Sequence, residues 1–243
     1  MRKFSLAAPL FGALIAGLMA LSGRAQPPAS SPTPPALTLD QVIQKVQAHY
    51  QALKTYQVEF DQELYSASQA RVISKGQGVV IYKKPSKMVW HYDVPEDHFY
   101  ITDGNTLYDY APADKEAYVM PVKDALYKSF LLGLGDLKKE FEISFHSGRP
   151  KTSDGLYQLD LVPRDQEERQ ALGTITLYLD PQSFQVKNTE MVDALGNRNH
   201  VVFKNPKENP DLPDSLFKFS PPPGVNVIKA QDLAPKKDNP PPK

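Results

Sequence analysis

Residues 76–110 hold three extended apolar and aromatic runs that turn-forming residues separate. A Lys-Pro-Ser turn at residues 84–86 divides the first two runs, and Asp-Gly-Asn at residues 103–105 follows the third. Because side chains alternate along a strand, one face of the second run carries Met88, Trp90 and Tyr92. An antiparallel sheet with so many large side chains on one face has to be covered there. The cover is either a packed core or a ligand.

The rest of the chain also reads as short strands with few helices. Apolar residues recur at three- and four-residue spacing in residues 39–53, and Thr38 with Gln41 has the form of a capping box, which predicts a helix. A second helical pattern covers residues 124–137. The predicted strands are residues 56–64, 78–82, 88–92, 99–102, 107–110, 117–120, 141–145, 156–162, 174–179, 185–192, 199–204 and 216–219. We therefore expect a mainly β (α+β) fold, a single curved antiparallel sheet whose concave face is capped by short helices.

The two ends of the chain differ from its middle in composition. Arg2 and Lys3 precede an uncharged apolar stretch at residues 4–23, and small residues follow it, which predicts a signal peptide. The alternative is a retained membrane helix. The expected division is a signal peptide at 1–25, a Pro-rich spacer at 26–36, one domain at 37–233 and a disordered Pro/Lys tail at 234–243. The chain contains no cysteine, so neither a lipid anchor on cysteine nor a disulfide is expected.

Charge and motifs argue against several classes of function. Lys plus Arg and Asp plus Glu each number 28, and this balance does not favour nucleic acid as a partner. The sequence has no HExxH, nucleophile-elbow or phosphate-loop motif, so we expect no enzyme activity, no cofactor and no metal. The charged run at residues 164–169 is interpreted as a solvated loop.

One turn keeps an enzyme alternative open. The side chains near it that could act as acids, bases or metal ligands are His91, Asp93, Glu96, Asp97 and His98. They form either a small reactive cluster or the solvated side chains of an ordinary turn, and we favour the turn.

The second helical pattern has two interpretations. Its apolar side chains are Leu126, Phe130, Leu131 and Leu134. They belong to an ordinary core, or they line a lipid-sized cavity between the helix and the curved sheet. Periodicity alone leaves both interpretations open.

Several short motifs, taken in order, resemble those of the LolA family. They are Phe60-Asp61-Gln62, Gly76-Gln77-Gly78, Lys84-Pro85, the strand around Trp90, Pro95, the aspartate-glycine-tyrosine pattern of residues 103–110, residues 193–197, Phe203, and the Phe-Lys-Phe-Ser-Pro-Pro-Pro-Gly-Val ending at 217–225. The resemblance covers residues 38–228. It implies an unclosed antiparallel β-barrel with a helical lid over a hydrophobic cavity.

The resemblance also implies a function, which is that of a periplasmic lipoprotein carrier. Such a protein accepts acylated lipoproteins from an inner-membrane Lol ABC transporter, shields their acyl chains, and passes them to an outer-membrane receptor of the same fold. We expect a monomer, and the missing cysteine favours the soluble carrier over the receptor, which is itself a lipoprotein. The predicted acyl-chain-binding residues are Phe60, Met88, Trp90, Leu126, Phe130, Leu131 and Leu134.

One residue departs from the family pattern. The family usually has arginine before the proline at Pro85, where it holds the lid closed, and this chain has Lys84. Lysine keeps the charge but lacks the planar fork of donors, so we predict a weaker lid latch. The alternative functions are a lipid- or lipoprotein-sensing envelope regulator, and an envelope hydrolase that uses His91, Asp93, Glu96 or His98.

Overall fold

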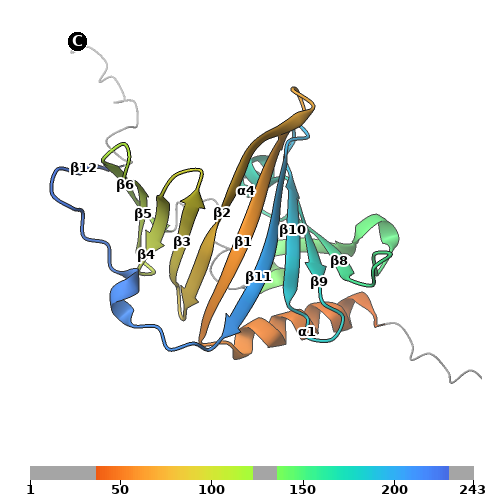
Figure 1. Ribbon diagram of the computed structural model, residues 1–243. Helices are drawn as coiled ribbons and strands as arrows, with labels where there is room; N and C mark the ends of the chain where they lie inside the picture. The colour runs from red at the N-terminus through yellow and green to blue at the C-terminus, as the bar shows by residue number, and fades with distance from the viewer. Residues whose placement is uncertain (1–36, 123–135, 230–243) are drawn as a thin grey trace, which may run out of the picture. The chain divides into compact units, whose positions relative to one another are not determined.

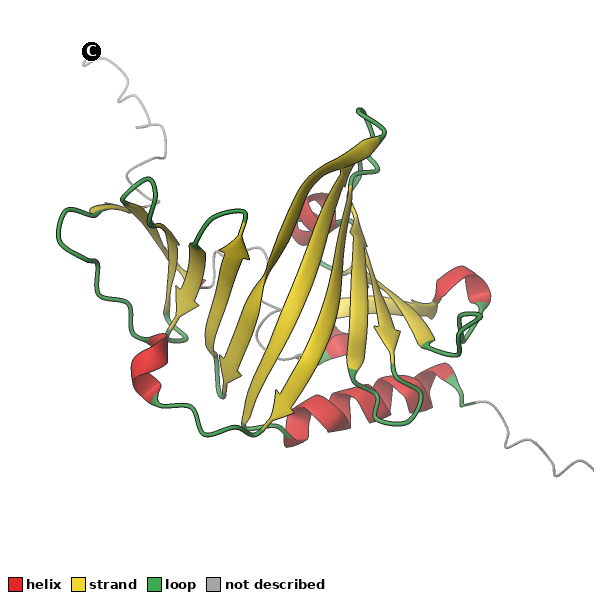
Figure 2. Ribbon diagram, in the orientation of Figure 1, coloured by secondary structure: helices red, strands yellow, loops and turns green. Residues whose placement is uncertain are grey.

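The computed structural model describes residues 37–122 and 136–229, which form one large sheet with a few helices (Figures 1 and 2). The helices are α1 (Leu39–Ala52), α3 (Leu137–Glu140) and α4 (Gln166–Leu172), with short 3-10 turns η2 (His146–Gly148) and η3 (Asp214–Phe217). The strands are β1 (Thr55–Ser66), β2 (Arg71–Lys83), β3 (Lys87–Val94), β4 (His98–Thr102), β5 (Thr106–Ala111), β6 (Glu116–Pro121), β7 (Phe141–Phe145), β8 (Tyr157–Pro163), β9 (Thr174–Leu179), β10 (Val186–Val192), β11 (Arg198–Glu208) and β12 (Asn226–Lys229).

The sheet has 12 strands in the order β12-β6-β5-β4-β3-β2-β1-β11-β10-β9-β8-β7. Every neighbouring pair is antiparallel except β12 and β6, which are parallel. The outermost strands β12 and β7 do not pair with each other, so the curved sheet stays unclosed. The predicted fold class is confirmed, with a parallel last strand that the sequence did not indicate.

Helix α1 begins at the capping box predicted from the sequence. The Thr38 hydroxyl accepts from the Gln41 N–H, and the Gln41 side chain accepts from the Thr38 N–H. The apolar side chains Val42, Ile43 and Val46 are buried in a core cluster with residues of β7, β8 and β9. Figure 1 shows α1 running along the strand ends on that side of the sheet. The helix therefore holds one half of the sheet in its curvature.

Two predictions of local structure are wrong. Residues 216–219 were expected to form a strand, but η3 occupies residues 214–217 and Phe217 is buried, at 1% exposure, against the sheet face that bears Val89. The run at residues 164–169 was expected to be a loop, but it opens α4. The Asp165 side chain caps this helix by accepting from the Glu168 N–H, and Gly173 ends it at φ 63°.

Several predicted features lie outside the described residues. They are the signal peptide at 1–25, the spacer at 26–36, the tail at 234–243 and the helix that carries Leu126, Phe130, Leu131 and Leu134. None of the helices in residues 37–122 and 136–229 is both long and apolar enough to cross a membrane.

Candidate functional site

The predicted apolar face of β3 lies at the centre of the sheet. Phe60, Met88 and Trp90 belong to one buried cluster, with exposures of 1%, 2% and 7%. The Phe60 ring lies 4.8 Å from the ring of Trp90 and 5.0 Å from that of Tyr92, centroid to centroid. Tyr92 in turn lies 6.4 Å from Tyr100 on β4. These contacts make a continuous aromatic wall across β1, β3 and β4.

A cavity of about 200 Å³ opens beside this wall. Its lining comes from β1, β3, β4, α4, β9, β10 and β11, and consists of Gln62, Trp90, Tyr92, Tyr100, Leu172, Ile175, Thr189, Met191, Asn199 and Val201. Phe60 and Met88 lie in the same core cluster as Trp90, but they do not line the cavity. Of the predicted acyl-chain contacts in the described residues, Trp90 therefore borders the cavity directly.

The cavity carries no charge on its walls. Among the described residues that line it, none is acidic or basic, and the polar ones are Gln62, Thr189, Asn199 and the two tyrosines. The Gln62 amide donates to the Asn199 side-chain oxygen at 2.8 Å, so these two polar groups bind each other. Burial raises the pKa of Tyr56, which packs on the same cluster, to about 12, so its hydroxyl stays neutral. Such a surface suits an uncharged, mainly apolar ligand.

Glycines on β2 make room for the aromatic wall. At Gly76 an added Cβ would lie 3.1 Å from the Tyr92 ring, so a larger residue would displace that ring. At Gly78 an added Cβ would lie 1.9 Å from the His91 carbonyl oxygen, closer than any side chain allows. The Gly-Gln-Gly motif therefore sets the position of Tyr92.

A second cavity of about 210 Å³ lies beside α1 and β7. Its lining includes Asp40, Lys138 and Arg164, and Lys138 bonds Asp40 at 2.8 Å. This charged rim makes it a poorer site for an apolar ligand than the cavity beside Trp90.

The possible reactive cluster near the β3–β4 turn is divided between the two faces of the sheet. His91 alternates with Trp90 and Tyr92 and so faces away from the cavity. On the other face, His98 Nε2 lies 2.6 Å from Asp109 Oδ1. The four residues of the hydrolase alternative are therefore not brought together.

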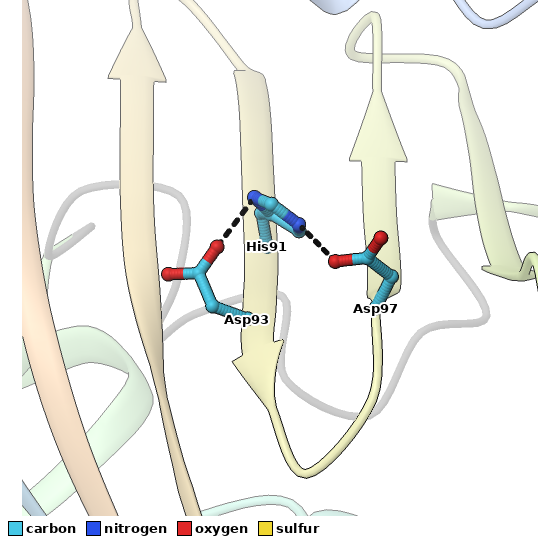
Figure 3. Close-up of side chains that lie close together, drawn as sticks. All are labelled: His91, Asp93 and Asp97. Atoms are coloured by element: carbon cyan, nitrogen blue, oxygen red, sulfur yellow. Dashed lines mark hydrogen bonds and ion pairs between the residues drawn. The ribbon is translucent and has the colours of Figure 1, made fainter.

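Three side chains do meet on the face away from the cavity. Asp93 lies 3.4 Å from His91 Nδ1 and Asp97 lies 3.3 Å from His91 Nε2. Figure 3 shows the two carboxylates at opposite edges of the ring. One ligand atom from each of these three residues lies within 4.8 Å of the others. Asp93 and Asp97 are exposed, so the group lacks the enclosure typical of catalytic sites.

Lys84 does bond to a helix, but this helix is α1 and not the predicted lid helix. Its ammonium donates to the Gln51 carbonyl in the last turn of α1, where a cation suits the helix dipole. The lid helix that it was expected to hold, which carries Leu126 and Leu134, lies outside the described residues, so the latch to that helix stays a prediction.

Sequence reasoning missed most of the wall opposite Trp90. Leu172 comes from α4, and Ile175, Met191 and Val201 come from β9, β10 and β11. Alternation could have assigned Met191 and Thr189 to one face, because they are two residues apart on a predicted strand. Nothing in a single sequence pairs that face with Trp90.

Comparison with known proteins identifies the family. Residues 51–220 match the family described as "Outer membrane lipoprotein carrier protein LolA". An outer-membrane lipoprotein carrier protein of Cupriavidus pinatubonensis is 28% identical over 209 residues, covering 83% of this chain and 92% of the relative. One of Bordetella avium is 30% identical over 164 residues, covering 66% of this chain and 75% of the relative.

A solved structure agrees in fold. An uncharacterized conserved protein from Thermus thermophilus has a TM-score of 0.52 at 12% identity, covering 78% of this chain and 98% of that one. At this identity the likeness concerns the fold alone. The sequence match spans more than half of the chain, and the unclosed sheet with its apolar cavity agrees with the fold that the sequence motifs implied. The chain belongs to the LolA family of outer membrane lipoprotein carrier proteins.

Proposed function

We propose that this protein is a periplasmic carrier that binds the acyl chains of lipoproteins. The observation that carries the proposal is the uncharged cavity beside the aromatic wall of Trp90, Tyr92 and Tyr100. Its relatives in Cupriavidus and Bordetella are named for lipoprotein transport, which supports the same assignment. The apolar side chains at positions 126, 130, 131 and 134 are proposed as further acyl-chain contacts on the strength of their helical spacing.

The energetics of acyl chains require such a site. Each methylene moved out of water is worth about 0.8 kcal/mol, so a free triacylated protein does not stay dispersed in an aqueous compartment. An apolar wall without charges buries these methylenes, and no ion has to lose its water when the acyl chains bind. Binding must still be weak enough for the cargo to leave at its destination.

The cavity has to enlarge to hold a complete cargo. Its volume of about 200 Å³ is below the roughly 300–1,000 Å³ typical of pockets for drug-sized ligands. Because β12 and β7 do not pair, these two edges can move apart without breaking any hydrogen bond between strands. An unclosed sheet therefore supports a site whose size changes with its load.

The proposed route follows from this chemistry. The signal peptide at residues 1–25 would export the chain to the periplasm, an inner-membrane Lol ABC transporter would load it, and an outer-membrane receptor of the same fold would unload it. Lys84 would help by holding the end of α1 against the sheet while the site is empty.

The test is release of lipoprotein from membranes. Spheroplasts that hold a radiolabelled lipoprotein are incubated with the purified protein, and the supernatant is analysed for a soluble complex. We expect a one-to-one complex, and mass spectrometry of the complex should detect the triacylated N-terminal peptide. Failure to release lipoprotein, together with purified protein free of acylated species, would contradict the carrier role. If instead the lipoprotein is cleaved, and His91→Ala abolishes cleavage, the hydrolase alternative is correct.

A further inference from the structure

The indole nitrogen of Trp90 is a buried donor without an acceptor among the described residues. The side chain is 7% exposed, and Nε1 forms no hydrogen bond with any residue in the described parts of the chain. An indole N–H can donate but cannot accept. A buried donor left unpaired costs about 1–3 kcal/mol, so native proteins rarely keep one without a reason.

The position of this donor suggests the reason. Trp90 forms part of the wall of the uncharged cavity, but its Nε1 is fully buried, so a ligand reaches this atom only as the cavity enlarges to take its load. The amides of Gln62 and Asn199 in the same wall already bond each other. The indole N–H is therefore the buried donor of this wall that a hydrogen-bond acceptor on the ligand would pair with.

We infer that Trp90 Nε1 donates a hydrogen bond to an acyl carbonyl oxygen of the bound ligand. The inference rests on the proposed acyl-binding function and adds a polar anchor to it. An acyl chain joined as an ester or amide carries one strong neutral acceptor, at the end of an otherwise apolar chain. A neutral acceptor suits a wall without charges, where an ionised group would be costly to bury. The anchor would fix how far each chain enters the cavity.

The matched probes are an acyl lysophosphatidylcholine and its alkyl ether analogue of equal chain length. They share headgroup and chain and differ in the ester carbonyl. We expect the wild-type protein to bind the ester about tenfold more tightly, which corresponds to about 1.4 kcal/mol. Because the chain has a single tryptophan, one indole N–H signal appears in the ¹⁵N-edited NMR spectrum. That proton should shift downfield with the ester and much less with the ether.

Two variants assign the donor. Trp90→Phe keeps an aromatic ring and removes the N–H, so ester and ether should bind equally. Thr189→Val removes a different buried donor of the wall, the hydroxyl of a side chain that is 3% exposed, and should keep the preference for the ester. The NMR measurement uses the wild-type protein and decides the question even if Trp90→Phe folds poorly.

Each outcome is decisive. Three results would overturn the assignment to Trp90 while leaving acyl binding intact. They are equal affinities for the two probes, an indole proton whose chemical shift is the same with ester and ether, and a preference for the ester that is lost in Thr189→Val instead of Trp90→Phe. Failure of the wild-type protein to bind either probe would contradict the proposed function itself.

A synthetic triacylated cysteinyl peptide then separates the two sources of the carbonyl. If it causes the same indole shift at lower concentration than the lysophospholipid, the carbonyl belongs to lipoprotein cargo. The reverse order would assign the site to membrane phospholipid.

Discussion

Filling the cavity from Val201 should abolish acyl binding without unfolding the protein. Val201 on β11 is 4% exposed and lies in the cavity wall, paired across the sheet with Gln62 and Thr189. Val201→Phe adds about four carbon atoms of side chain to that space. If they displace as many ligand methylenes, the lost burial is about 3 kcal/mol, or roughly a hundredfold in affinity.

The fold should tolerate this change. Phenylalanine favours strands as valine does. The new ring gains burial within the existing cavity, and overpacking costs about 1–3 kcal/mol. These effects oppose each other and are similar in size, so the melting temperature should change little.

The assay is displacement of a fluorescent fatty-acid probe, with thermal melting measured in parallel. The matched control is Val202→Phe, one residue along the same strand, whose side chain points to the opposite face of the sheet. We expect the control to bind like the wild type. A folded Val201→Phe protein with affinity within threefold of the control would show that acyl chains do not occupy this cavity.

Changes at three further positions test the scaffold around the site. Tyr50→Phe leaves the Val186 N–H without its 2.9 Å acceptor and should lower the free energy of unfolding in urea by about 1–3 kcal/mol. Lys83 on β2 and Lys87 both bind the Asp214 carboxylate and lower its pKa to about 2. Asp214→Asn removes this carboxylate. The stabilisation of the fold by this carboxylate is therefore present at pH values above 3.8, the pKa of the unfolded state, and is lost as the pH falls through about 2. The melting curves of variant and wild type should converge there. Lys84→Ala should speed uptake of an apolar dye and Lys84→Arg should slow it, and equal stopped-flow rates would show that this ammonium only caps α1.

Alternation along single strands carried most of the correct prediction. The period of two around Trp90 put Met88 and Trp90 on one face, and the structure places both in one cluster. His91 and His98 fall on opposite faces because His98 pairs with Tyr92, which alternates with His91, and the sequence alone does not give this register across the turn.

Helix α4 shows how a local signal can be overlooked. The capping residue Asp165 and the terminal Gly173 were both visible in the sequence. The charged run between them lacks an apolar stripe, because this short helix contributes little more than Leu172 to the site. Hydrophobic periodicity is a weak guide to a helix with so small a buried face.

The cavity itself could not be derived from the sequence. Its walls combine Trp90 from β3 with Met191 and Val201 from β10 and β11. Their approach depends on how β1 pairs with both β2 and β11 and on how far the sheet curls. Pairing between distant strands is a property of the whole sheet, so the pattern of a short stretch of sequence does not predict it.

The last strand has a consequence for the edges of this sheet. The family match ends at residue 220, before β12, so a protein trimmed to the matched region would lose the strand that pairs with β6. The exposed N–H and C=O groups of β6 would then be a template for another chain. The opposite edge, β7, is of similar length, with 5 residues against 6 for β6. Residues 226–229 thus protect the protein from edge-to-edge association, and their removal should promote aggregation while leaving the cavity intact.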